Sequence, residues 1–283
     1  MSDAASHPRV LDLPRDECAL ATARSAIRRV QELLPAFLED VATAAEAEGF
    51  VVAMDGCVGS TVAATMAAEA LGPERVTGLV MPAGLSDEAP ARDAEAAASA
   101  LGIEHYRFRL QPVVAAFREA VGASDGPTDD LVAMRNATER FQTACAYYVA
   151  NTRDRLVVGS VDRTDRLLGS VAKYGANGVD VALLGDLYRT EVRALARDLD
   201  LPRSIRERSP RLVSHAEPTD AERLGVDQRT LDSLLRLTVD EGEPAAVVAD
   251  RLGIEPAAVR RVKRWCSATR HKRHSPPKPS MGS

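Results

Sequence analysis

A cluster of small and hydroxyl residues follows the first strongly apolar run of the chain. The stretch Val51 to Gly72 reads VVAMDGCVGSTVAATMAAEALG, so an apolar run leads into a small-residue turn and an alanine-rich helical pattern. A strand, a tight turn and a helix in that order turn the backbone N–H groups of the helix N-terminus toward an anion. The loop DGCVGST, residues 55–61, is therefore a candidate phosphate site. It is not a Walker A loop, because no lysine precedes its Ser-Thr pair.

A second chemical signal is the distribution of charge. The formal net charge is -5, but the segment from Arg251 to the end holds nine Lys/Arg and one acid, a local +8 that leaves -13 on residues 1–250. A basic tail on an acidic body can hold the phosphates of a small ligand, a nucleic acid or an acidic partner surface. The other interpretation is a solvated terminus.

The length and composition of the chain limit what the loop can belong to. With 283 residues and 45% hydrophobic residues, the chain can bury a full core as one large domain, with or without an appendage. Its apolar runs are far shorter than the roughly 20 residues of a membrane-spanning helix, and its N-terminus has no secretory pattern. The four cysteines stand far apart, without a CxxC pair. We expect a cytoplasmic protein with reduced thiols, no zinc site and no membrane partner.

Hydrophobic periodicity predicts strands that alternate with helices. Residues 19–48 carry apolar positions at three- and four-residue steps, which is typical of a long amphipathic helix. Apolar runs predict buried strands at FVVAMD (50–55), RVTGLVMP (75–82), HYRFRL (105–110) and RLVVGS (155–160). Helices are predicted up to Leu71 and over 87–101, 130–150 and 185–201.

Strands separated by helices predict an α/β fold, a doubly wound parallel sheet with helices on both faces and a C-terminal helical extension. Ligands of such sheets bind beyond the carboxyl ends of the strands. We divide the chain into a flexible N-terminus (1–18), an α/β domain (19–240), and a helical hairpin with the basic tail (241–283) that belongs to the same unit.

The motifs at these strand ends resemble those of the ammonia-dependent NAD synthetases, members of the ATP-pyrophosphatase, adenine nucleotide alpha hydrolase-like group. In that family the motifs read SGGVDS, MP, N-x-x-A-R, GTxxxxE, TKYGD, DLxK and HKR. The counterparts here are DGCVGS (55–60), MP (81–82), NATER (136–140), GSVDRTD (159–165), AKYGANGVD (172–180), DLYR (186–189) and HKR (271–273). The resemblance runs from about residue 20 to 278.

The resemblance implies a reaction. ATP adenylates the nicotinate carboxylate of deamido-NAD, pyrophosphate leaves, and ammonia displaces AMP to give NAD. Because a carboxylate is a poor acyl electrophile, the adenylate supplies a leaving group, while the enzyme orients two nucleotides and neutralises phosphate charge with magnesium. Ammonia is the expected nitrogen donor, because the chain has no attached glutaminase domain and no cysteine set up as its nucleophile.

The resemblance also implies which residues bind ATP and its magnesium. The implied ATP contacts are Asp55, Gly56, Cys57, Val58, Gly59, Ser60, Met81, Ser160, Arg189 and Arg211. The family's magnesium-binding aspartate is Gly59 here, and its second metal ligand, a glutamate, is Asp165, so a rebuilt metal site would pair Asp165 with Asp55. A carboxylate at Asp55 repels phosphate by about 1–4 kcal/mol at about 4 Å. The loop therefore predicts weakened or lost magnesium-ATP binding.

The dinucleotide half of the site matches the family more closely. The implied contacts to deamido-NAD are Arg140, Lys173, Asp180, His271 and Lys272, although the aspartate that follows KYG in the family is Ala176 here. In the family the basic tail reaches the partner subunit's site. The resemblance thus implies a homodimer in which the tail clamps the dinucleotide's phosphates.

Several alternatives remain open at this point. Arg140 and His271 could be solvated surface charges, Asp180 a turn residue, and Asp55 an N-cap for the following helix. Cys57 is an inert small residue rather than a nucleophile, because no histidine is positioned to activate it. The chain could be a working synthetase or a non-catalytic paralogue that binds a dinucleotide. A DNA-reading role for the helix-turn-helix pattern PAAVVADRLGIEPAAVRRVKRW (244–265) is a third and weaker hypothesis.

Overall fold

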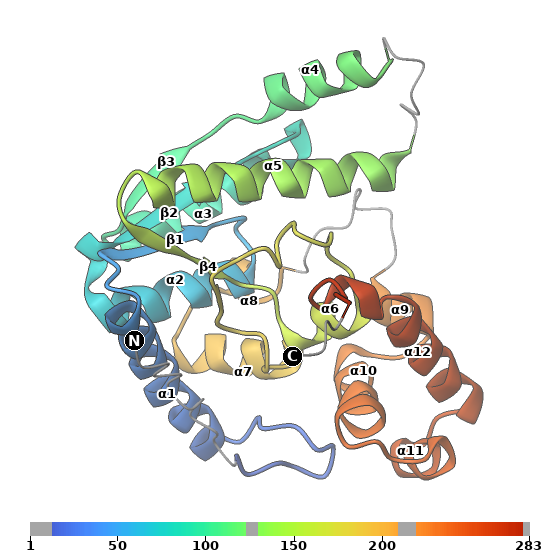
Figure 1. The fold of residues 1–283 in the computed structure, drawn as a ribbon. Coiled ribbons are helices and arrows are strands. Elements are labelled where there is room, and N and C mark those ends of the chain that lie inside the picture. Colours follow the sequence, from blue (N-terminus) through green and yellow to red (C-terminus); the bar gives the residue numbers. More distant parts are fainter. Residues whose placement is uncertain (1–12, 123–129, 209–218, 280–283) are drawn as a thin grey trace.

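A single parallel sheet organises the molecule. In the computed structural model, which describes residues 13–122, 130–208 and 219–279, the strand order is β3-β2-β1-β4-β5 and every pairing is parallel (Figure 1). The strands are β1 Gly49–Ala53, β2 Val76–Val80, β3 Glu104–Arg107, β4 Arg155–Gly159 and β5 Val181–Ala182. The expected doubly wound α/β fold is confirmed.

The central strand shows why the sheet is covered on both faces. Along β1, Phe50 and Val52 belong to one apolar core, whereas Val51 between them belongs to another. Side chains of successive strand residues point to opposite faces, so a run of apolar residues must be buried on both sides. This explains why the strand reads as a continuous apolar run in the sequence.

Helices supply the two layers that cover the sheet. One core contains residues of α1 Arg24–Ala44, α2 Val58–Leu71, α3 Glu88–Ala100, α7 Arg189–Asp198 and α8 Arg203–Arg206. The opposite core is closed by α5 Leu131–Asn151, and α4 Gln111–Gly122 precedes α5 at the edge of the molecule (Figure 1). Phe117 of α4 meets Phe141 of α5 edge to face, with ring centroids 5.4 Å apart.

A third apolar core lies among the C-terminal helices. It is formed by α6 Arg163–Leu168, α9 Asp220–Leu224, α10 Gln228–Leu235, α11 Ala245–Leu252 and α12 Pro256–Ala268. Short 3-10 turns cover Pro73–Arg75, Leu85–Asp87 and Arg270–Lys272, and a π turn covers Arg236–Asp240. In the hairpin of α11 and α12, Val248, Val259 and Val262 are fully buried. The apolar faces of this hairpin therefore pack against the body of the protein.

No helix in the described part of the chain has the length and apolar character needed to cross a membrane.

Candidate functional site

The loop between β1 and α2 is held by its own first carboxylate. Asp55 Oδ1 accepts hydrogen bonds from Cys57 N at 2.9 Å and from Ser60 Oγ at 2.6 Å. The N-cap of α2 is Cys57, so Asp55 closes the turn that precedes the helix. Gly56 has φ +76°, and a Cβ there would lie 2.2 Å from the Pro90 carbonyl oxygen. Only glycine fits this position.

The start of α2 packs directly against the segment after β4. A Cβ on Gly59 would lie 2.8 Å from the backbone oxygen of Ser160, closer than side chains approach a carbonyl. Gly59 and Ser160 both follow strands that are neighbours in the sheet, β1 and β4. Both loops therefore meet at the carboxyl edge, where the fold predicts a ligand.

Replacing Gly59 with alanine is expected to destabilise the protein. Overpacking against Ser160 costs about 1–3 kcal/mol, and the higher helix propensity of alanine returns at most about 1 kcal/mol. Urea unfolding should therefore show a net loss of up to about 2 kcal/mol in the free energy of unfolding. The matched control is Gly84→Ala, whose Cβ would have its nearest contact at 3.6 Å. Equal stability of the two variants would show that the contact with Ser160 is not tight.

A buried arginine joins two carboxylates beside these loops. Arg189, the first residue of α7, is 5% exposed; its Nε lies 3.1 Å from Asp162 Oδ2 and its Nη2 forms an ion pair with Asp165. Asp162 also caps α6, because its Oδ1 accepts a hydrogen bond from Asp165 N at 2.8 Å. Burial raises the pKa of Asp162 to about 7, against the lowering effect of the Arg189 charge. The Arg189 guanidinium therefore forms ion pairs with both carboxylates.

Behind this cluster, Asp232 of α10 is fully buried and collects four donors. It accepts from Thr164 Oγ1 at 2.7 Å, Thr190 N at 2.7 Å, Thr190 Oγ1 at 2.6 Å and Gln228 Nε2 at 2.9 Å. Thr164 Oγ1 in turn accepts from Arg189 N at 3.0 Å. The network fixes the N-terminus of α7 against α6 and α10. Burial raises the pKa of Asp232, and these hydrogen bonds oppose that shift.

A group of basic side chains assembles on the other side of the same edge. Arg140 of α5 donates from Nε to the Lys173 carbonyl oxygen at 3.2 Å, and Lys272 Nζ donates to the Gly169 carbonyl oxygen at 2.7 Å. Burial lowers the pKa of Lys272, and the nearby charges of Arg135 and Arg140 lower it further. The side chains of Arg140 and Lys272 therefore come near each other, from α5 and the C-terminal tail, and Arg140 also contacts the backbone of Lys173 in the 170–180 loop. The Lys173 ammonium lies over the Tyr174 ring, 5.2 Å from its centroid.

The other expected residues make contacts of their own. Asp180 accepts from Tyr147 Oη at 3.0 Å and from Val157 N at 2.8 Å, which ties the end of the 170–180 loop to β4. His271 is exposed, with Nδ1 3.2 Å from the Ala268 carbonyl oxygen. Met81 is buried after β2, and its carbonyl oxygen accepts from Gln142 Nε2. Arg211 lies outside the described residues.

Comparison with known proteins decides the family. Residues 30–276 match the sequence model of the family described as NAD synthase. The chain belongs to the NAD synthase family. It is 36% identical to the NH(3)-dependent NAD(+) synthetase of Halobacterium salinarum over 269 residues, covering 95% of this chain and 97% of that protein. The corresponding enzyme of Methanosarcina mazei is 34% identical over 256 residues, covering 90% and 99% of the two chains.

Solved structures agree with this assignment. An NMN synthetase from Francisella tularensis superposes with a TM-score of 0.75 at 26% identity, covering 90% of this chain and 99% of the other. An NH3-dependent NAD synthetase from Campylobacter jejuni superposes with a TM-score of 0.73 at 22% identity, covering 90% and 99%, and shows the shared fold. The match therefore extends over almost the whole of each protein.

At the positions where the NAD synthase family has its metal ligands, this chain has residues that do not fit a magnesium ion. Gly59 brings no oxygen ligand, Asp165 is paired with Arg189, and Asp55 Oδ1 is bonded within its own loop. Within residues 13–122, 130–208 and 219–279, no group of three His, Cys, Asp or Glu side chains is arranged to hold a metal ion. Arg189, where the family has a lysine, brings a fixed positive charge to Asp165.

A carboxylate that sequence reasoning missed lies beneath the basic group. Glu139 Oε2 accepts from Ala172 N at 2.7 Å, and its Cβ packs so closely that a side chain on Gly175 would meet it at 2.9 Å. Burial raises the pKa of Glu139, against hydrogen bonds from the backbone of Ala172 and Ala176. The family motif has alanine at position 139 and aspartate at 176, whereas this chain has glutamate and alanine. The acid is thus lost at position 176 and gained at position 139, and this pair of differences from the family motif could have pointed to Glu139 in the sequence.

Proposed function

We propose that this chain carries out the reaction of the NAD synthase family, the ATP-dependent amidation of deamido-NAD by ammonia. The observation that supports the proposal is the basic group at the carboxyl edge of the sheet, in which the charges of Arg140 and Lys272 lie close to each other and Arg140 contacts the backbone of Lys173. Positive charges that converge at a strand edge bind phosphates, and a dinucleotide carries two of them.

In this proposal the basic group and the start of α2 bind different substrates. The basic group binds the pyrophosphate of deamido-NAD, while the backbone N–H groups at the start of α2 face the phosphates of ATP. Holding the two nucleotides together places the nicotinate carboxylate next to the α-phosphate, which is the main contribution an enzyme makes to such a transfer. Ser160, Met81 and the 55–60 loop form the proposed ATP contacts, with Arg211 from outside the described residues.

A second candidate function rests on the acidic cluster. Arg189 holds Asp162 and Asp165, and Gly59 packs against the Ser160 carbonyl, so both family positions for metal ligands are occupied by other contacts. These contacts favour a non-catalytic paralogue that binds the dinucleotide as a regulator or as a partner subunit.

The cellular setting follows from the same proposal. The substrates are soluble nucleotides, so we place the protein in the cytoplasm. We also propose a homodimer in which the basic tail, including His271, reaches the partner's dinucleotide site.

The deciding experiment is a pair of titrations followed by an assay. Purified protein is titrated calorimetrically with deamido-NAD and with ATP, with and without magnesium, and NAD formation is then measured with ammonium in the same buffer. Binding of both ligands with NAD produced supports the amidation. Binding of the dinucleotide alone supports the non-catalytic paralogue. Failure to bind deamido-NAD at millimolar concentration rejects both functions. Nicotinate mononucleotide is the control ligand, since it lacks the adenylate half.

A further inference from the structure

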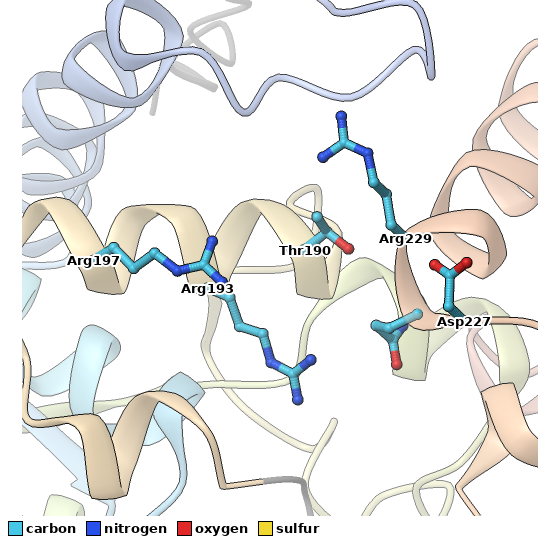
Figure 2. Close-up of a pocket in the computed structure, with 6 residues that line it drawn as sticks. Thr190, Arg193, Arg197, Asp227 and Arg229 are labelled. Atoms are coloured by element: carbon cyan, nitrogen blue, oxygen red, sulfur yellow. The ribbon is translucent and has the colours of Figure 1, made fainter.

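A polar cavity lies between α7 and α10, outside the basic group described above. Its volume is about 290 Å³, and its lining residues are Thr190, Arg193, Arg197, Asp227, Gln228 and Arg229. In Figure 2, Arg193 and Arg197 project from α7, while Arg229 and Asp227 come from the start of α10 across the cavity. The volume is at the lower end of the range for small-molecule sites, so the cavity suits a compact ligand.

The lining carries excess positive charge that the described residues do not neutralise. Three arginines face one acid, Asp227. Its Oδ1 accepts from Thr230 N at 2.9 Å, and its Oδ2 accepts from Thr230 Oγ1 at 2.8 Å. Arg229 forms an ion pair with Asp16. Neither Arg193 nor Arg197 forms a salt bridge with any residue in the described ranges. The local excess therefore comes from these two side chains of α7.

Arg193 is half-buried and has no counter-ion among the described residues. Its Nε is buried and has no hydrogen-bond partner among the described residues. Burial lowers the pKa of Arg193, and the charges of Arg189 and Arg197 lower it too, while Asp232 and Asp162 act in the opposite direction. A half-buried guanidinium without a partner is costly, because desolvation is not repaid by an ion pair. A bound anion would remove that cost.

The neutral polar groups of the cavity are already engaged. Thr190 Oγ1 and Gln228 Nε2 both donate to Asp232, at 2.6 and 2.9 Å. The donors left to a ligand are thus guanidinium groups, whose planar fork matches the oxygens of a phosphate. Arg193 and Arg197 are four residues apart on α7, so they lie on one face of the helix.

From these contacts we propose that the α7–α10 cavity is a phosphate-binding site in which Arg193 and Arg197 are the ligand-binding residues. The ligand is a phosphate or pyrophosphate group, either as the inorganic ion or at the end of a mononucleotide. This site does not depend on the proposed amidation.

The test is calorimetric titration of the full chain, in phosphate-free buffer, with inorganic phosphate, pyrophosphate and AMP in separate experiments. We expect saturable binding of at least one of them. Arg193→Gln should raise the Kd of one binding site at least 10-fold, and Arg193→Gln with Arg197→Gln should remove one site per chain, whether or not pyrophosphate or AMP also binds at the proposed nucleotide site. Tighter binding of AMP than of phosphate and pyrophosphate identifies a nucleotide as the source, and the reverse identifies the inorganic ion.

The matched control is Arg28→Gln, an exposed arginine of α1 outside the cavity, which should bind with unchanged affinity. Because Arg193 has no ion pair, Arg193→Gln should unfold at the same urea concentration as the unmodified protein or at a higher one, so loss of binding would not reflect loss of fold. Absence of saturable binding at about 10 mM ligand overturns the proposal. So does equal binding by the unmodified protein and the Arg193→Gln variant.

Discussion

Arg189→Met is expected to lower the free energy of unfolding at pH 8 by about 3–5 kcal/mol. The substitution removes the only ion-pair partner that the described residues offer to the buried carboxylate of Asp162, and it leaves Asp165 without its ion pair. Breaking a buried ion pair from one side is costly because the remaining charge stays desolvated. Equilibrium urea denaturation at pH 8 measures the loss.

The loss should shrink as the pH falls. The folded-state pKa of Asp162 is raised to about 7 from its ordinary 3.8, so its contribution to stability is fully present below about pH 4 and is lost as the pH rises through 7. Without Arg189 the pKa rises further, because the opposing positive charge is gone. At pH 5 the variant can then hold a neutral acid, and its deficit should be clearly smaller than at pH 8.

Arg197→Met is the matched control for this experiment. Arg197 is an exposed arginine on the same helix, without an ion pair to any residue that the structure describes, so its loss should change stability by less than about 0.5 kcal/mol. A deficit below 1 kcal/mol for Arg189→Met at pH 8, or one that does not depend on pH, would contradict the role given to the cluster.

The second large effect concerns the proposed dinucleotide site. Lys272→Gln should raise the Kd for deamido-NAD about 10–100-fold, because a hydrogen bond to a charged group contributes about 1.5–3 kcal/mol. Lys272 lies in the basic group with Arg140, and its ammonium already reaches the Gly169 carbonyl oxygen. Calorimetry at two salt concentrations measures the affinity, and the difference between the unmodified protein and the variant should narrow at high salt.

Lys278→Gln provides the control from the same tail. Lys278 is exposed beyond the last 3-10 turn, so its substitution removes the same charge without touching the basic group. The two variants should differ by at least 10-fold in Kd. Similar affinities would mean that the tail acts only through its overall charge. A normal affinity in Lys272→Gln would remove this residue from the site.

The layers of the fold could be predicted because both faces of the sheet are buried. A continuous apolar run such as Phe50 to Met54 is typical of a strand that is buried on both faces. The two-residue strand β5, Val181–Ala182, was missed because so short a segment has no periodicity, and it pairs with Val158 and Gly159 only through the tertiary fold. The helix α6 was missed for a similar reason, since it has six residues and is defined by its Asp162 cap.

The site was predictable in its positions but not in its pairings. Motif register predicted a dinucleotide site that includes Arg140 and Lys272, and the structure places these two charges close to each other, while their role stays a prediction. Motif register could not indicate that Arg189 turns toward Asp162, 27 residues earlier, because that contact depends on how α6 and α7 pack. Asp232 was missed for the same reason. A lone acid in an amphipathic helix reads as a solvated charge until its four donors are located.

The anchoring of the tail has a consequence for synthesis on the ribosome. Every strand in the part of the chain that the structure describes is complete by Ala182, whereas the basic group needs Lys272, which is translated later. Because the chain is synthesised from its N-terminus, the residues of the sheet leave the ribosome before the residues of the proposed dinucleotide site are complete. Arg273 and Lys272 then bind the carbonyl oxygens of Leu167 and Gly169 at the end of α6. A chain that ends between α8 and Lys272 would contain every described strand but lack one residue of the proposed dinucleotide site, so we expect it to bind the dinucleotide more weakly than a chain that includes Lys272.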